Sequence, residues 1–192
     1  MSPYPAQVSR EAIVERAREI IENEGLERLT LQHLAAALGI QAPSPYHHVA
    51  NKRELLRAVN ERSAQALVDA VLAAAEATDE PVARLLRMAK AYRAFAHEHP
   101  ITYELTFSNV EPNARPDPAQ LEAMALPAQA LVADLTGEAA SLSALRGLLA
   151  LMHGFVLLEL NQQLRRGGDL GAVFEDVVQA YLRGWRGMPP EW

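Results

Sequence analysis

Apolar residues recur every three to four positions along most of the chain, which is the spacing of one face of an amphipathic helix. Residues 10–24 show this pattern first, and Gly25 follows at a position where helices commonly end. A shorter helix is predicted over residues 31–38, with Thr30 as its N-cap and Gly39 directly after it. The chain therefore opens with two predicted helices, each followed by a glycine.

A third short helix and a long fourth helix are predicted next. The short helix covers about residues 42–49. The long helix begins at Lys52, because Asn51 and Glu54 form a capping pair ahead of an apolar run, and it extends to about Ala77. About 26 residues at 1.5 Å each span roughly 39 Å, so this helix leaves the N-terminal part and enters the next one.

Five more helices are predicted in the rest of the chain. They cover about residues 81–99, 100–107, 118–136, 141–164 and 172–186. Pro127 lies inside the third of them and must kink or break it. The predicted fold is all-α, with about nine helices divided between a small domain in residues 1–55 and a larger one in residues 56–192.

The second and third helices together predict a helix-turn-helix, in which the second helix of the pair enters the major groove of DNA. Ser44 and Tyr46 supply hydroxyl groups, His47 and His48 supply imidazoles, and Lys52 follows at the start of the next helix. Groups of these kinds bind phosphates, which position a protein, and base edges, which specify sequence.

The run from Leu38 to Leu56 resembles the recognition segment of the TetR (tetracycline-repressor-like) family of regulators. The shared features are the glycine turn, Ala-Pro-Ser at 42–44, Tyr-x-His-Val at 46–49 and Asn-Lys-x-x-Leu-Leu at 51–56. The resemblance implies a dimeric bacterial transcription regulator, with a DNA-binding head and a helical ligand-binding and dimerisation domain.

The same resemblance implies roles for single residues in DNA binding. Phosphate contacts are expected from Thr30, Tyr46, His48 and Lys52. Groove-facing positions are expected at Ala42, Pro43, Ser44 and Tyr46. His47 stands where a larger aromatic residue is common in the family, so its role stays open.

Pro45 departs from the family pattern, which usually has leucine at this position. A proline inside a helix removes a hydrogen bond and clashes with the preceding turn, at a cost of about 3 kcal/mol. That cost disappears if Ala42 is the N-cap, because Pro43 and Pro45 then lie in the first turn, where backbone N–H groups have no helical acceptor. We therefore predict that this helix starts no earlier than Ala42.

The C-terminal part resembles one subgroup of the family. The run Tyr92–Ala96, followed by His99-Pro100, is similar to its mid-domain segment. His153-Gly154 is similar to its Trp-x-x-x-His-Gly signature, although Leu149 stands where the tryptophan would be.

A ligand pocket is expected in the larger domain, built mostly from apolar walls with a few polar groups. Its candidate residues are Met88, Tyr92, Phe95, Tyr103, Phe107, Met124, Leu149, Met152 and His153. Each aromatic residue taken alone is more often part of a core than of a pocket. His153 is a lone histidine in an apolar helix, and such a histidine more often pairs with a neighbouring group than binds a ligand.

Nearly every position between residues 148 and 160 is apolar, which predicts a helix that is buried all round. A monomer of this size can hardly cover such a helix, so we expect a second subunit to supply a wall. The candidate interface residues are Leu148, Phe155, Val156, Leu160, Phe174, Val177 and Tyr181.

Composition restricts the remaining function classes. The chain has 192 residues, no cysteine and a net charge of −6, while residues 1–60 hold seven basic and seven acidic residues. The DNA-binding prediction therefore rests on the motif and not on charge. No apolar run approaches the roughly 18 residues of a membrane span, and the N-terminus lacks the pattern of a signal peptide. We expect a cytoplasmic location and no membrane segment.

The sequence offers no catalytic or metal-binding constellation. His97 and His99 flank Glu98, but residues two apart on a helix point in different directions, so they do not predict a metal site. Phosphate-binding glycine loops and nucleophile elbows are also missing from the sequence. We therefore expect no enzyme activity, no catalytic residues, no cofactor and no metal.

Two functions remain open at this point. The first is a transcription regulator, most simply a repressor, whose partners are an operator in double-stranded DNA, a second copy of the chain and a small apolar effector. The alternative is a helical ligand- or protein-binding module that does not read specific DNA. The net negative charge and Pro45 favour the alternative.

Overall fold

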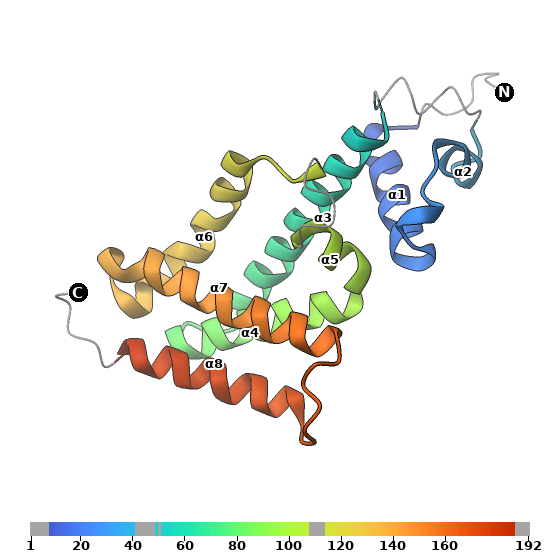
Figure 1. Cartoon of the computed structure of the whole chain (residues 1–192). Helices are drawn as coiled ribbons and strands as arrows, with labels where there is room; N and C mark the ends of the chain where they lie inside the picture. The colour runs from blue at the N-terminus through green and yellow to red at the C-terminus, as the bar shows by residue number, and fades with distance from the viewer. Residues whose placement is uncertain (1–7, 41–48, 50, 108–113, 187–192) are drawn as a thin grey trace. The chain divides into compact units, whose positions relative to one another are not determined.

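The computed structural model describes residues 8–40, 49, 51–107 and 114–186 (Figure 1). Within these residues the fold is all-α and no strand occurs, so the predicted fold class is confirmed. The α-helices are α1 (Arg10–Glu24), α2 (Leu31–Ala37), α3 (Lys52–Ala75), α4 (Pro81–Glu98), α5 (Pro100–Phe107), α6 (Pro118–Thr136), α7 (Glu138–Leu160) and α8 (Leu170–Arg186), and a 3-10 turn, η1 (Leu26–Arg28), follows α1. The helix expected over residues 42–49 lies almost entirely outside the described residues.

Capping side chains begin α1, α2 and α3, and two of them, Thr30 and Asn51, are the predicted ones. Ser9 Oγ accepts from the Ala12 N–H at 3.2 Å, and Thr30 Oγ1 accepts from the His33 N–H at 3.0 Å. Asn51 Oδ1 accepts from the Glu54 N–H at 3.0 Å. Each side-chain oxygen satisfies one of the backbone donors that a helix start leaves without a partner.

The chain folds into two compact units. The first consists of residues 1–65 and 99–118, and the second of residues 66–98 and 119–192. The expected boundary at 55/56 therefore differs from the observed division, because α3 continues without interruption past that point and α5 packs on α1.

The core of the first unit is built from the predicted apolar face of α1. Ile13, Ala17, Ile20 and Ile21 are all buried. They pack with buried residues from the other elements of the unit, namely Leu29, Leu34, Val49, Leu55, Val59, Leu105 and Ala114. Leu105 belongs to α5, which joins this small helix to the core of the first unit.

The core of the second unit is made by α4, α7 and α8, which lie side by side (Figure 1). The buried side chains of α4 are Leu85, Met88, Ala89, Tyr92, Phe95 and Ala96. Phe174, Val178 and Leu182 on α8 are also buried. Gly147 allows a close approach between α7 and α8, because a Cβ atom placed there would lie 2.2 Å from Tyr181 Oη.

Pro127 was expected to kink or break its helix, and it does not break it, because α6 runs through it from Pro118 to Thr136. Pro127 is exposed, so water can bind the backbone carbonyl that loses its partner in the preceding turn. Helix α7 is not buried all round within one chain: only one face is buried, and Leu149 remains 48% exposed.

One described helix, α7, is long and apolar enough to cross a membrane by length and composition. The sequence does not predict such a helix, because its longest uninterrupted apolar run is shorter than a membrane span. Core helices meet the same two criteria, and α7 packs against α4 and α8 in the second unit.

Candidate functional site

The first helix of the predicted helix-turn-helix and its turn have the expected geometry. Helix α2 packs through Leu34 and Ala35, which are both buried. After α2 the Gly39 N–H donates to the Ala36 carbonyl at 3.1 Å, and the Ile40 N–H donates to the Ala35 carbonyl at 3.0 Å. This pair of bonds is a Schellman motif, and it needs a left-handed residue at Gly39, whose φ is 67°.

All of the expected groove-facing residues, together with His47 and His48, lie outside the described residues. They are Ala42, Pro43, Ser44, Tyr46, His47 and His48. The elements on either side of them are defined: Ile40 closes the turn after α2, Val49 is buried in the core, and Asn51 caps α3.

Thr30 and Lys52 are the two expected phosphate contacts that the structure describes. Both are exposed at helix N-termini, Thr30 before α2 and Lys52 as the first residue of α3. The Thr30 hydroxyl accepts from a backbone N–H and can still donate its own hydrogen. The N-terminal ends of helices also favour anions such as phosphate.

Two polar side chains that the sequence analysis missed, Glu22 and Asn60, hold α5 and the segment after it within the first unit. The Glu22 carboxylate on α1 accepts from the N–H groups of Ile101 and Thr102 at 3.1 and 3.0 Å, and from Thr102 Oγ1 at 2.6 Å. Buried Asn60 on α3 donates to the Ala114 carbonyl at 2.7 Å and accepts from Thr106 Oγ1 at 3.3 Å. Pro100 at the start of α5 was a signal that the following N–H groups need acceptors.

The expected ligand residues are divided between the two units. Met88, Tyr92, Phe95 and Met152 are buried in the second unit, and Tyr92 Oη lies 3.3 Å from His153 Nδ1. Burial lowers the pKa of His153, so the neutral imidazole is favoured.

The other four expected ligand residues do not belong to the buried core of the second unit. Tyr103 and Phe107 belong to α5 in the first unit, with ring centroids 5.1 Å apart. Met124 is half-buried on α6, and Leu149 lies on the exposed side of α7.

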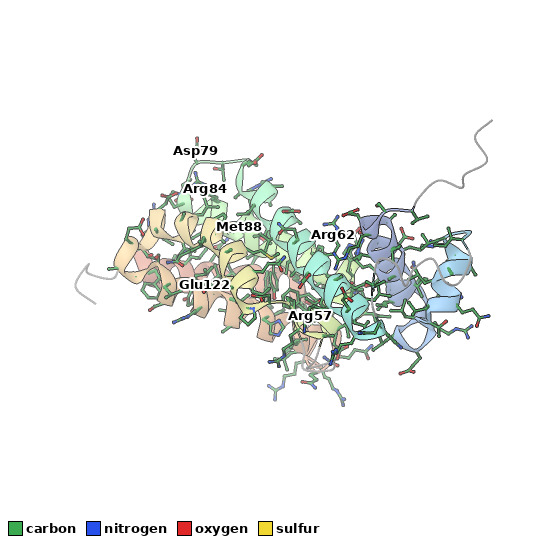
Figure 2. The ribbon with its side chains drawn as sticks, turned by 90° about the horizontal axis from the view of Figure 1, so that it is seen from above. Arg57, Arg62, Asp79, Arg84, Met88 and Glu122 are labelled. Carbon is green, nitrogen blue, oxygen red and sulfur yellow. The ribbon has the colours of Figure 1, made fainter. Side chains whose placement is uncertain are left out.

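Two of the clefts among the described residues of the second unit are formed without any of the expected ligand residues. One, of about 480 Å³, lies among the end of α3, α4 and the start of α8. The other, of about 360 Å³, is lined by Leu72, Ala75, Glu76, Asp79, Arg84, Pro127 and Leu131. Arg84 lies beside Asp79 at the start of α4 (Figure 2) and also donates to Asp134 Oδ2 of α6 at 2.7 Å.

Three of the residues expected at the dimer interface are buried within a single chain. Leu148, Val156 and Phe174 are buried in the core of their own subunit, so they have almost no surface left for a partner. Phe155 and Leu160 are half-buried, and Phe155 packs edge-on against Phe174. Tyr181 is half-buried too, and its hydroxyl donates to the Ala144 carbonyl at 2.8 Å.

Several apolar residues of α7 and α8 are exposed. Among the large ones, only Val177 was a candidate for the dimer interface in the sequence. The large ones are Leu142, Leu149, Leu158, Val173 and Val177. Apolar content alone could not distinguish them from the core residues, because α7 is apolar on both faces.

An ion-pair cluster joins α4 to α7 and was also missed. The Arg93 guanidinium makes two hydrogen bonds to the Glu159 carboxylate, one of them from Nε to Oε2 at 2.8 Å. His97 Nε2 lies 2.9 Å from the same Oε2. Hydrogen bonding from Arg93 lowers the pKa of Glu159, against the opposing effect of burial, and the contact with His97 lowers it further. Among the described residues no group of three potential metal ligands occurs.

Comparison with known protein families accounts for both parts of the chain. Residues 13–59 match the family described as bacterial regulatory proteins of the tetR family. Residues 85–181 match the family described as the tetracyclin repressor-like C-terminal domain. The first match includes the whole of the predicted recognition segment.

Individual relatives agree with these two matches. An HTH-type transcriptional regulator of Mycobacterium tuberculosis is 39% identical over 187 residues, which cover 94% of this chain and 83% of the relative. The class D tetracycline repressor protein of Escherichia coli is 43% identical over 54 residues, or 28% of this chain and 25% of the repressor. The solved structure of a possible TetR family transcriptional regulator from Streptomyces coelicolor has the same fold, with a TM-score of 0.66 and 24% identity over 93% of this chain and 98% of the regulator.

Proposed function

The chain belongs to the TetR family of bacterial transcriptional regulators, and from this membership we propose that it is a repressor that binds a specific DNA operator and is released by a small apolar ligand. Regulators of this family act on DNA and are generally not enzymes. The family match over residues 13–59 is the observation that carries the proposal, because it spans the complete helix-turn-helix.

The geometry of the first unit supports DNA recognition through residues 42–49. The Schellman turn at Gly39 ends α2, and the Asn51 cap starts α3. In the proposed complex, Ala42, Pro43, Ser44 and Tyr46 face the major groove. Thr30, Tyr46, His48 and Lys52 bind phosphates, and His47 adds a donor near the groove.

The two family matches indicate which part of the chain binds DNA and which part binds the effector. We propose that residues 1–55, which lie within the first compact unit, bind DNA, and that residues 56–192 bind the effector and a second copy of the chain, in the cytoplasm. We place the C-terminal domain in the subgroup with the Trp-x-x-x-His-Gly signature, on the basis of His153-Gly154. Tyr92 and His153 are the proposed polar contacts to the effector, and the buried methionines Met88 and Met152 its apolar ones.

Release from DNA requires two arrangements of the dimer. A ligand shifts the balance between them only by its different affinities for the two. In the arrangement that binds DNA, the two recognition helices match half-sites about 34–36 Å apart. The effector favours the arrangement in which this spacing is lost.

Binding to the DNA upstream of the protein's own gene tests the proposal. We expect the purified chain to bind this DNA much more tightly than a scrambled sequence, at two salt concentrations, with affinity that falls as salt rises. The double variant Tyr46→Phe with Lys52→Ala should weaken binding by about 10- to 100-fold, because it removes two phosphate contacts. Fluorescence anisotropy measures all of these affinities.

Lys90→Ala is the matched control, because Lys90 is an exposed lysine in the other unit. It should leave DNA affinity unchanged. Equal binding to both DNAs, or no effect of the double variant at unchanged folding, would instead support a helical binding module that does not read specific DNA.

A further inference from the structure

The larger cleft of the second unit lies on the face of α4 that is turned away from the core. Its volume is about 480 Å³, within the range of small-molecule sites. Helix α4 contributes Arg87, Lys90, Ala91, Arg93 and Ala94, which alternate with the core residues of the same helix. The other walls are Ala74 at the end of α3 and Gly171, Phe174 and Glu175 at the start of α8. The cleft is therefore separate from the buried Tyr92–His153 pair.

The charges in the cleft are mostly positive, although the whole chain carries a net charge of −6. Three basic residues line it, against one acid, Glu175. The positive charge of Arg93 is balanced by the Glu159 carboxylate, to which Arg93 makes two hydrogen bonds. Lys90 Nζ lies 2.7 Å from Glu175, in a half-exposed ion pair that exchanges readily with other partners.

Arg87 is the best-placed group to bind an anion. Its Nε donates to the Ala74 carbonyl at 3.2 Å, which fixes the guanidinium against the end of α3. That bond leaves the two terminal nitrogens of the guanidinium for a ligand, and their forked geometry matches a carboxylate. Arg87 and Lys90 are three residues apart on α4, so their side chains are neighbours.

The remaining walls suit an apolar group. Ala74, Ala91 and Ala94 present methyl groups, and Gly171 has no side chain. A Cβ atom at Gly171 would lie 3.6 Å from Arg93 Nη1 and 3.1 Å from Asp169 Oδ1. Glycine therefore leaves space in the cleft that any other side chain would fill. The cleft thus pairs small apolar walls with adjacent cations.

We propose that this cleft binds a small organic anion, with the carboxylate held by Arg87 and Lys90 and the apolar part of the molecule lying on the alanines. The site goes beyond the proposed function, because it depends neither on DNA binding nor on the buried residues proposed to contact the effector. The DNA-binding experiment and the ligand experiment can therefore fail independently.

Three eight-carbon probes with the same tail and different head groups test the site: octanoate, 1-octanol and octylammonium. We expect isothermal titration calorimetry on the full chain to show saturable binding of octanoate, at least about tenfold tighter than either other probe. Arg87→Gln should weaken octanoate binding by about tenfold, the usual effect of losing one charge-assisted hydrogen bond. Ala91→Leu, made alone, should also weaken octanoate binding, because the larger side chain fills the cleft while every charge is kept.

Arg183→Gln is the matched control, because Arg183 is an exposed cation on α8 outside the cleft. It should bind octanoate as the wild type does. Equal affinity for octanoate and 1-octanol would overturn the proposal, and so would unchanged octanoate affinity in Arg87→Gln or in Ala91→Leu. Circular dichroism confirms that each variant is folded, and Arg87 is exposed, so its replacement leaves the core intact.

Discussion

Glu159 shows how one side chain can hold two helices together. It is an acid near the end of an apolar helix, and its side chain is only 8% exposed. A carboxylate in that position is costly unless it is paired, and Arg93 and His97 on α4 supply the pairing. The sequence contains all three residues, but their alignment depends on how α4 packs against α7, which the periodicity of each helix does not specify.

The lowered pKa of Glu159 makes this contact sensitive to acid. Since its folded-state pKa lies below the usual 4.5, the stabilisation is fully present above about pH 4.5 and is lost as the pH falls through the folded-state value. Glu159→Gln should therefore lower the free energy of unfolding by roughly 1–3 kcal/mol at pH 7. Urea unfolding from pH 7 to pH 3 should show the gap between variant and wild type narrowing in acid.

The matched control is Glu175→Gln, which removes an exposed ion pair with Lys90. Exposed pairs contribute about 0–1 kcal/mol, so this variant should stay close to the wild type at every pH. A loss in Glu159→Gln that does not change between pH 7 and pH 3 would contradict the assignment of the stabilisation to the ionised carboxylate.

At the scale of helices, the sequence predicted the starts and ends better than the contacts. Ser9, Thr30 and Asn51 act at short range, so their capping bonds follow from the local sequence. Leu148 and Leu149 are adjacent leucines, yet one is buried and the other is exposed. That difference depends on which face of α7 meets α4 and α8, and an apolar stripe on both faces does not encode it.

The approach of α7 to α8 gives a prediction at this scale. Gly147→Ala should destabilise the second unit by about 1–3 kcal/mol, because the new Cβ would meet Tyr181 Oη at 2.2 Å and displace its hydrogen bond to the Ala144 carbonyl. Thermal unfolding of the variant measures the loss. The loss should shrink in a Tyr181→Phe background, where the hydroxyl is absent.

Gly154 provides the control on the same helix. A Cβ atom at Gly154 would meet nothing within 4 Å. Gly154→Ala should therefore stabilise the chain by about 0.5–1 kcal/mol, because alanine loses less backbone entropy in a helix than glycine does. If both glycine variants changed stability in the same direction and by similar amounts, steric contact with Tyr181 would not be the cause.

At the scale of the whole molecule, the proposed dimer depends on apolar surface that one chain leaves uncovered. Leu142 and Leu149 lie seven residues apart on α7, and Val173 and Val177 lie four apart on α8, so each pair shares a helix face. Because α7 and α8 pack together, these faces can form one surface for a second copy. Homodimer interfaces are typically more apolar than the rest of a protein surface.

Leu149→Glu combined with Val177→Glu should separate the dimer, because association would bury two unpaired carboxylates in each subunit. Sedimentation velocity at micromolar concentration should show a dimer for the wild type and a monomer for the variant. Leu126→Glu is the control: Leu126 is 57% exposed, more than Leu149, but it lies on α6 and its replacement should leave the dimer intact. The monomeric double variant should also lose tight operator binding, because the two half-sites are bound together by the two DNA-binding domains of one dimer. A double variant that remains dimeric would place the interface elsewhere on the chain.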